Sequence, residues 1–249
     1  MDNTKRFSSR VDNYVKYRPS YPQDAMSYLF NKGINKNSIV GDIGSGTGIL
    51  SKLLINNVKS LYCVEPNDEM RNYAQSTLSK YDNFFSINAT AENTTLKDNS
   101  LDAITVAQAF HWFDIEKCKL EFNRILKPKS NIFLIWNNRL TNTPFLKEYD
   151  QILKDLSKDY NTVNHQNLVD KEFDLFFDKK WEKVTFENYQ IFNFEQFKGR
   201  VFSSSYTPEE SDSAYPSFYK AIEELFEKEN TNGFVKFNYT TEIISKKTN

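Results

Sequence analysis

A run of glycines and a carboxylate further along the chain are the first residues of this sequence that could do chemistry. Glycines occupy positions 44, 46 and 48. Such spacing allows a tight turn, lets a ligand approach the backbone, and points the N–H groups of a following helix at it. Glu65 lies 21 residues after Gly44, about the offset at which an acidic side chain binds both hydroxyls of a ribose. Together they predict a site for an adenosine-type ligand, and a glycine-rich turn without a ligand is the alternative.

The same turn fits a nicotinamide dinucleotide less well. Ile49 stands at the third position after Gly46, where the dinucleotide motif has a glycine. Asp42 precedes the turn, and its carboxylate would repel a pyrophosphate but suits the ammonium group of an amino acid. The residues favour an adenosine ligand that carries an amino acid, and an NAD-type oxidoreductase remains the alternative.

Alternating strands and helices are needed to hold this turn. Short apolar runs predict strands over residues 38–43, 61–65, 83–88, 101–107 and 131–136. Helical spacing of apolar residues predicts helices over residues 47–56, 68–78 and 115–126, the last one ending ahead of Pro128. Strands that are apolar throughout indicate a parallel sheet covered on both faces, which right-handed crossovers make doubly wound.

After residue 138 the pattern changes. Helices are expected over residues 145–157 and 217–228, and a polar loop over 161–167. Residues 181–192 alternate as a half-exposed strand does, and residues 234–244 predict a last, antiparallel strand at the sheet edge. The predicted fold is therefore α/β: a Rossmann-like, doubly wound, mostly parallel seven-stranded sheet with an antiparallel edge strand and a helical lid insertion.

We expect one domain over residues 1–249. Residues 1–34 are interpreted as an N-terminal lid segment and residues 35–140 as the core that binds the ligand. Residues 141–215 are interpreted as the lid or substrate insertion, and residues 181–249 include the last two strands.

Several motifs resemble those of one enzyme family. Residues 42–48 resemble motif I of class I methyltransferases that use S-adenosylmethionine (SAM), and residues 64–67 with Met70 resemble motif II. Residues 90–92 and 96–102 are similar to the adenine-edge loop and the strand after it. Residues 107–114 and the aromatic segment 7–22 are similar to the type 11 small-molecule subgroup, which includes trans-aconitate methyltransferase-like proteins. The resemblance covers about residues 7–138.

This resemblance implies SAM as the cofactor and a set of residues that bind it: Tyr14, Arg18, Asp42, Gly44, Ser45, Gly46, Gly48, Glu65, Pro66, Met70, Thr90, Ala91, Glu92, Gln108 and Ala109. Three positions depart from the family pattern. Gly41 replaces a larger apolar residue and should loosen its strand. Thr90 stands where Asp is frequent, so that Glu92, a backbone carbonyl or water would meet the adenine amino group. Ser45 replaces a frequent Cys.

Methyl transfer from a sulfonium mainly requires aligned reactants in a dry pocket, and a base only where the nucleophile carries a weakly acidic proton. His111 is the candidate base, since it follows the strand 101–107 and its pKa range suits proton transfer. The alternative is a structural or cofactor-side role. His165 is interpreted as solvated. No metal site is expected.

Three arginines are candidates for binding acidic groups, because arginine pairs bidentately with carboxylates. By resemblance, Arg18 would bind the methionine carboxylate of SAM or an acidic substrate. Arg139 and Arg200 could each pair with an acidic group of the substrate, and residues 199–208 could line a polar pocket.

The charge balance gives no reason to expect a nucleic-acid or membrane partner. Lys plus Arg number 32 and Asp plus Glu 33, for a net charge of -1. No apolar stretch approaches a membrane span, and residues 1–10 are polar, unlike a secretory signal. We therefore expect a cytoplasmic methyltransferase acting on a small, carboxylate-bearing acceptor at O or N. A non-catalytic SAM-binding protein is the other alternative. The acceptor's identity, the atom methylated, the use of a base, and a monomeric or homodimeric state are left open.

Overall fold

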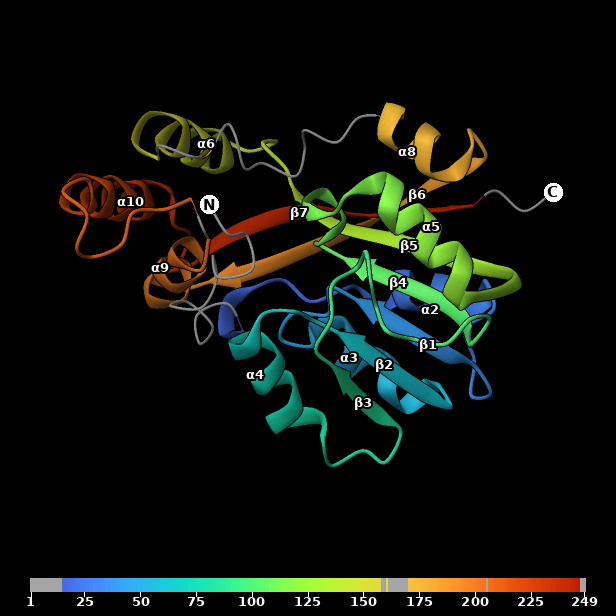
Figure 1. Ribbon diagram of the computed structural model, residues 1–249. Coiled ribbons are helices and arrows are strands. Elements are labelled where there is room, and N and C mark those ends of the chain that lie inside the picture. The colour runs from blue at the N-terminus through green and yellow to red at the C-terminus, as the bar shows by residue number, and fades with distance from the viewer. Residues whose placement is uncertain (1–14, 158–159, 161–169, 205, 247–249) are drawn as a thin grey trace.

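The computed structural model describes residues 15–157, 160, 170–204 and 206–246, in which seven strands form one sheet of order β3-β2-β1-β4-β5-β7-β6 (Figure 1). The strands are β1 (Ile39–Ile43), β2 (Ser60–Val64), β3 (Phe84–Ile87), β4 (Leu101–Ala107), β5 (Leu126–Arg139), β6 (Trp181–Phe192) and β7 (Val235–Lys246). Strands β1 to β5 pair in parallel, whereas β7 is antiparallel to both β5 and β6. The predicted fold class is confirmed.

The expected place of the last strand is wrong. Strand β7 lies inside the sheet between β5 and β6, so that β6 forms the edge. The two strands differ in how far they are buried: β7 buries Phe237, Ile243 and Ile244, while alternate residues of β6 are exposed. A strand that alternates in this way can be covered on only one face, as suits an edge.

The helices are α2 (Gln23–Asn31), α3 (Ile49–Leu54), α4 (Asp68–Leu78), α5 (Ile115–Ile125), α6 (Pro144–Leu156), α8 (Asp170–Phe177), α9 (Phe194–Phe202) and α10 (Tyr215–Glu229), with 3-10 turns η3 (Ile55–Asn57) and η4 (Phe110–Trp112). The predicted bounds of α4, β4 and β6 agree with the structure. Helices α2, α8 and α9 were not predicted as elements. The predicted polar loop at 161–167 and His165 lie outside the described residues.

Local signals account for several of these boundaries. The side chains of Asn67, Asp114 and Thr143 accept hydrogen bonds from the first turns of α4, α5 and α6, which satisfies donors that a helix leaves unpaired. Helix α5 ends at Ile125 ahead of Pro128, and β5 begins at once.

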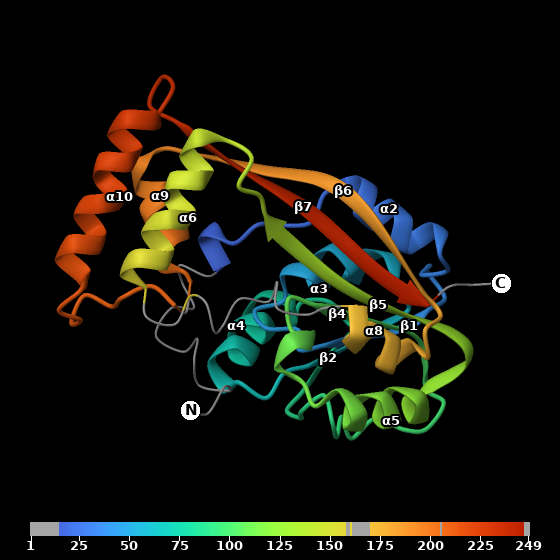
Figure 2. The same cartoon turned by 90° about the horizontal axis from the view of Figure 1, so that it is seen from above.

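Helices cover both faces of the sheet. Buried residues of α2 and α3 pack on one face and those of α5 and α8 on the other. A third core joins α6, α9 and α10, which lie side by side beyond the sheet (Figure 2). Its centre is aromatic, with the rings of Phe145, Phe197 and Phe237 within 6 Å of one another between centroids.

Gly41 in β1 is explained by its neighbour. A Cβ atom at this position would lie 2.7 Å from Cδ1 of Leu101, a fully buried side chain of β4. Leu101 therefore occupies the space that a larger residue at position 41 would need. The predicted loosening of the strand stays a prediction.

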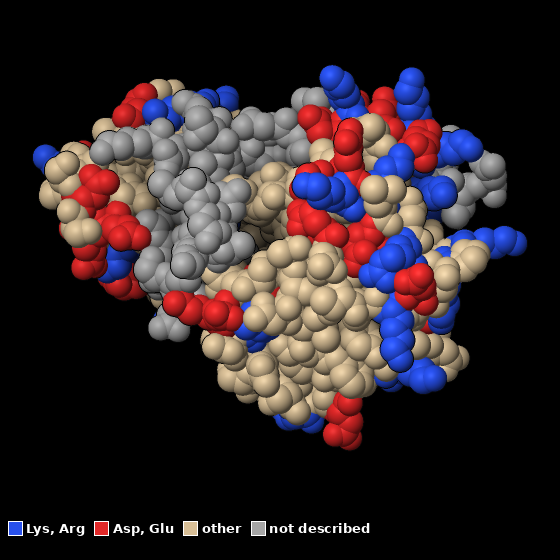
Figure 3. Space-filling model, in the orientation of Figure 1, with Lys and Arg blue, Asp and Glu red and all other residues tan. Residues whose placement is uncertain are grey.

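The described surface carries both signs of charge. On the face drawn in Figure 3, Lys and Arg side chains lie among Asp and Glu side chains. Ion pairs such as Lys119–Asp178 join described residues of opposite charge. Within the described ranges, no helix is long and apolar enough to span a membrane, and no group of three or more His, Cys, Asp or Glu could hold a metal ion.

Candidate cofactor and acceptor site

The glycine turn after β1 is the centre of the site. Gly44, Gly46 and Gly48 have φ angles of 69°, 55° and 83°, a region that side chains disfavour. At Gly44 a Cβ atom would lie 2.6 Å from Cβ of Ala109 and 3.0 Å from the ring of Phe113. The turn thus requires glycine for its conformation and, at Gly44, also for space.

Glu65 lies beside this turn at the carboxyl end of β2. Its carboxylate accepts hydrogen bonds from the backbone N–H groups of Gly46 (2.9 Å) and Asn67 (2.8 Å). Only 7% of the residue is exposed. Burial raises the pKa of the Glu65 carboxyl above its ordinary value, although the two N–H groups oppose the shift. The carboxylate has lone pairs left for ligand hydroxyls.

A cavity opens over Glu65, which we call the nucleoside cavity. Its lining combines one buried carboxylate with apolar and aromatic walls, as suits a sugar and a flat base. The residues that line it are Gly44, Gly46, Glu65, Pro66, Asn67, Met70, Thr90, Ala91, Glu92, Ala107, Gln108, Ala109, Trp112 and Phe113.

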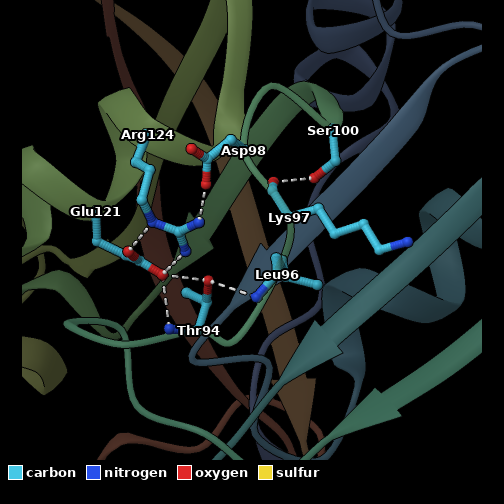
Figure 4. A network of polar contacts seen from close by, with 7 residues as sticks. All are labelled: Thr94, Leu96, Lys97, Asp98, Ser100, Glu121 and Arg124. Carbon is cyan, nitrogen blue, oxygen red and sulfur yellow. Dashed lines mark hydrogen bonds and ion pairs between the residues drawn. The ribbon is translucent and has the colours of Figure 1, made fainter.

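The loop that carries Thr90 to Glu92 is fixed from both sides. The side chain of Glu92 accepts a hydrogen bond from the backbone N–H of Asp114 at 3.0 Å. Further along, the buried carboxylate of Glu121 accepts bonds from both the backbone and the hydroxyl of Thr94 and pairs with Arg124 (Figure 4). These bonds tie the loop to α5 and keep the wall of the cavity in place.

A second cavity, which we call the arginine cavity, meets the first at Gly44, Gly46, Ala107 and Gln108. It is lined by Arg18, Pro19, Tyr21, Gly44, Ser45, Gly46, Thr47, Ile49, Leu50, Ala107, Gln108, Asn137, Arg139, Tyr160, Arg200 and Tyr206. Gln108, at the junction, has a φ of 58°. Non-glycine residues in this conformation are strained and cluster at functional sites.

Residues 17–20 form a strap along the arginine cavity. The guanidinium of Arg18 donates to the carbonyl of Ser203 at 3.1 Å, and the amide of Gln190 donates to the carbonyl of Tyr17 at 3.1 Å. The amide of Asn137 donates to the carbonyl of Ser20 at 3.3 Å. The strap thus connects the ends of β5, β6 and α9.

The two arginines proposed for the substrate differ in their partners. Arg139 pairs with Asp150 at 2.6 Å and donates to the hydroxyl of Tyr160 at 2.7 Å. Arg200 is only 5% exposed and donates to the hydroxyls of Tyr239 and Ser204, both at 3.1 Å. No described carboxylate lies within ion-pair distance of Arg200, and the side-chain bonds of its guanidinium go to hydroxyls.

Most predicted cofactor residues line one of the two cavities: Arg18, Gly44, Ser45, Gly46, Glu65, Pro66, Met70, Thr90, Ala91, Glu92, Gln108 and Ala109. Gly48 does not; it packs closely against Leu78 and Ala74 of α4. Tyr14 lies outside the described residues.

Asp42 lies behind the glycine turn and lines neither cavity. It is fully buried, and its two oxygens accept from the hydroxyls of Ser51 (2.5 Å) and Thr105 (3.0 Å). Burial raises the pKa of the Asp42 carboxyl to about 6, although both hydroxyls oppose the shift. In this structure Asp42 ties β1 to α3 and β4, and direct contact with the cofactor stays a prediction.

His111, the candidate base, lies on η4 with its ring 4.6 Å from that of Trp112. It is not among the residues that line either cavity. Trp112, its neighbour, lines the nucleoside cavity. The structure therefore favours the alternative of a structural role, and a catalytic role for His111 stays a prediction.

Sequence reasoning missed several lining residues, among them Tyr21, Thr47, Asn137 and Tyr160. Asn137 offered one signal, since it is a polar residue at the end of an apolar strand. The 199–208 run was expected to line a polar pocket, and its residues Arg200 and Tyr206 do line the arginine cavity.

Comparison with known proteins matches part of this geometry to a protein family. Residues 41–134 match the model of the methyltransferase domain family. The matched residues run from β1 through β5 and include the turn, Glu65 and most of the nucleoside cavity. The chain is 34% identical over 152 residues to an uncharacterized methyltransferase of Mycobacterium tuberculosis. That likeness spans 61% of this chain and 60% of the mycobacterial protein.

Other similar proteins agree with the domain. A probable SAM-dependent methyltransferase of Saccharomyces cerevisiae is 29% identical over 140 residues, spanning 53% of this chain and 46% of the yeast protein. A candidate methyltransferase from an antibiotic biosynthesis pathway of Anabaena variabilis has the same fold, with a TM-score of 0.66 at 19% identity over 94% of this chain and 100% of that one. For residues 41–134, the predicted class, a methyltransferase with SAM as its cofactor, agrees with the matched methyltransferase domain and with the yeast relative. The helices α6, α9 and α10 lie outside residues 41–134.

Proposed function

We propose that the whole protein transfers a methyl group from SAM to the O or N of a small, carboxylate-bearing acceptor. The observation that carries this proposal is the pair of joined cavities: one fits a nucleoside, and the other ends at a buried guanidinium without a described acidic partner.

The residues of the nucleoside cavity and the turn fit SAM. The carboxylate of Glu65 would accept from the ribose hydroxyls, and the side chains of Pro66, Met70 and Phe113 would enclose the adenine. The hydroxyl of Thr47 is buried in the arginine cavity and has no hydrogen-bond partner among the described residues. Since buried polar atoms are nearly always paired, a ligand group at this hydroxyl would complete the site.

We assign Arg18 to the carboxylate of the cofactor and Arg200 to the carboxylate of the acceptor. By the family resemblance, Arg18 would bind the methionine carboxylate. Arg200 is then left for the acceptor, because it lines the arginine cavity and has no described carboxylate within ion-pair distance. Arg139 has Asp150, so we no longer assign it a substrate carboxylate. The resemblance to trans-aconitate methyltransferase-like proteins supports an acidic acceptor by analogy only.

The bound cofactor would supply a methyl group activated by positively charged sulfur. The chain's own residues bind and orient both reactants and exclude water from the junction at Gly44 and Gln108. His111 stays a candidate base, and a nucleic-acid acceptor is disfavoured by the mixed surface charges.

Binding and transfer assays test the proposal. Calorimetric titration should give micromolar affinity for SAM and S-adenosylhomocysteine, roughly -8 kcal/mol, and far weaker NAD binding. Labelled SAM should then pass its methyl group to members of a panel of small acids rather than to amines without a carboxylate, tRNA or protein extract. NAD binding as tight as SAM, or label mainly in RNA or protein, contradicts the proposal.

The matched pair of arginine variants tests the acceptor's carboxylate. Charge-assisted hydrogen bonds are worth about 1.5–3 kcal/mol, so Arg200→Met should raise the acceptor's KM by roughly ten- to hundredfold while SAM affinity is kept. Arg139→Met, which removes an arginine that already has an acidic partner, is the control for folding of the helical group. A loss of SAM affinity in Arg200→Met, with KM unchanged, would assign Arg200 to the cofactor instead.

A further inference from the structure

A hydroxyl or amine acceptor must lose a proton when it is methylated, and the arginine cavity offers few groups to take it. Its described lining contains no Asp, Glu, His, Cys or Lys. The phenols of Tyr21, Tyr160 and Tyr206 are the ionisable neutral side chains there.

Two of these tyrosines are engaged in other ways. The hydroxyl of Tyr160 donates to Asp150 at 2.5 Å. Burial raises the pKa of the Tyr160 phenol, and the bond to Asp150 adds to the shift. Tyr160 therefore keeps its proton. Tyr21 is 9% exposed and packs in the core beneath α2 with Ala25 and Met26.

Tyr206 has the opposite surroundings. Burial disfavours its phenolate, but the guanidiniums of Arg200 on α9, Arg139 on β5 and Arg18 on the strap, helped by a hydrogen bond from Ser204, outweigh burial and lower the pKa of the Tyr206 phenol. The ring of Tyr160 packs edge-on against the Tyr206 ring, with centroids 5.0 Å apart.

The phenol of Tyr149 on α6 is fully buried, and burial, with Tyr206 adding to the effect, raises the pKa of this phenol. The carboxylate of Asp150 faces Arg139 and Tyr160. Its negative charge is therefore shared with those two groups. Three arginines that line the same cavity as Tyr206 thus act on its phenol, against the effect of burial.

We propose that Tyr206, as its phenolate, is the proton acceptor for the methylated group, and that this group is an O–H or N–H separate from the carboxylate held at Arg200. The inference rests on the proposed function, since it needs an acceptor in the arginine cavity. A carboxylate paired with Arg200 has its negative charge stabilised by the guanidinium and is a weaker nucleophile for it, which makes it the anchor and a second group the nucleophile.

The proposed step balances. A lone pair of the nucleophile forms the bond to the methyl carbon, the carbon–sulfur bond breaks, and its electron pair stays on the sulfur, which becomes a neutral thioether. The proton of the nucleophile passes to the phenolate oxygen of Tyr206 and from there to water. The predicted substrate class is a hydroxy acid or an amino acid.

The first test needs no substrate. Ionised tyrosine absorbs in the near ultraviolet, so an alkaline titration of the cofactor-free protein should contain one phenol that titrates below the ordinary value of about 10. Tyr206→Phe should remove that component and keep the ring. Tyr189→Phe removes a phenol that is 58% exposed on the edge strand and lines neither cavity, and it should leave the component in place. A component that persists in Tyr206→Phe overturns the proposal.

The second test uses the acceptor found by the transfer screen. General base catalysis contributes roughly 10²–10⁴-fold, so Tyr206→Phe should lower kcat by about hundredfold or more, with little change in the KM of either substrate. In this variant, the fall of kcat at acid pH, where the base would be protonated, should also disappear. An unchanged kcat in Tyr206→Phe, with loss in His111→Ala, would assign the base to His111 instead. If no acceptor is found, the proposed function fails while the titration still reports on Tyr206.

Discussion

The nucleoside cavity and the arginine cavity are built in different ways. The first is formed by consecutive turns after β1, β2, β3 and β4, all between residues 44 and 113. The second collects residues from Arg18 to Tyr206. Its partners include α6 and α9, which lie outside the matched domain. Local turns therefore build the cofactor end, whereas long-range packing builds the acceptor end.

This difference has a functional consequence. A cavity made by successive βα turns changes little as long as the sheet forms, because each turn is fixed by its own strand and helix. A cavity whose walls come from the strap, from β5 and from α9 can change its lining through any of these segments. On the proposed function, acceptor specificity can therefore vary through segments that do not build the nucleoside cavity.

Gly44 borders both cavities, and its substitution should have the largest effect. Gly44→Ala forces a side chain into left-handed backbone, which costs about 1–2 kcal/mol, and into a 2.6 Å contact with Cβ of Ala109. We expect SAM affinity to fall by more than about hundredfold, equivalent to ~2.7 kcal/mol, measured by calorimetry. Gly233→Ala, with a φ of 81° and open space around the new Cβ, carries the backbone cost alone. Equal SAM affinity in both variants would contradict the prediction, because it would mean that the residues around position 44 shift to make room for the new Cβ atom.

Glu65 tests the nucleoside cavity alone. Glu65→Ala removes the acceptor of two backbone bonds and of the predicted ribose bonds, each charge-assisted and worth about 1.5–3 kcal/mol, so SAM should bind roughly ten- to hundredfold more weakly. Asp68→Ala, a neighbouring acid whose side chain is 73% exposed, is the control. Unchanged SAM affinity in Glu65→Ala, with an intact fold by circular dichroism, would show that the ribose is held elsewhere.

Gly199 tests the arginine cavity through the strap. A Cβ atom there would lie 2.0 Å from the ring of Tyr17, so Gly199→Ala must displace the strap and with it Arg18. Alanine is more favourable than glycine inside a helix by up to about 1 kcal/mol. A loss of binding in this variant would therefore reflect the displaced strap and not unfolding of α9. We expect a several-fold rise in SAM's Kd and in the acceptor's KM with the melting temperature kept. Normal binding in a stable variant would mean that the strap does not position Arg18.

The pH dependence of stability tests the buried carboxyl behind the turn. Burial raises the pKa of Asp42 from its ordinary value of 3.8 to about 6. Ionisation of Asp42 therefore costs no folding stability below pH 3.8, an amount that grows between pH 3.8 and 6, and a constant amount above pH 6. The full cost is about 3 kcal/mol. The free energy of unfolding of Asp42→Asn, relative to the unsubstituted protein, should therefore rise between pH 4 and 7 in urea titrations.

Asp102 supplies the matched control, because the Lys127 ion pair and the N–H of Ile39 outweigh burial and lower the pKa of this carboxyl. For Asp102→Asn the relative stability should instead fall as the pH rises through the range where the carboxyl ionises. The same slope in both variants would contradict the assigned directions.

The sequence alone determined the cofactor end of this protein. The strands, the turn at Gly44 and the placement of Glu65 follow from apolar runs, positive φ and the 21-residue offset, which act over short stretches of chain. Helix α4 and strand β4 even had their bounds predicted to the residue. Their caps and apolar faces are local as well, as the bond of Asn67 to the first turn of α4 shows.

Only the tertiary structure decided the acceptor end. Arg139 and Arg200 are equivalent as sequence, but the fold brings Asp150 to one of them and only hydroxyls to the other. In the same way, β7 lies inside the sheet because β6 pairs with one side of β7 while β5 pairs with the other. The second side of β6 faces no strand of the described sheet. Pairing partners far apart in the chain are set by packing and by the cost of burying charge, neither of which a local pattern records.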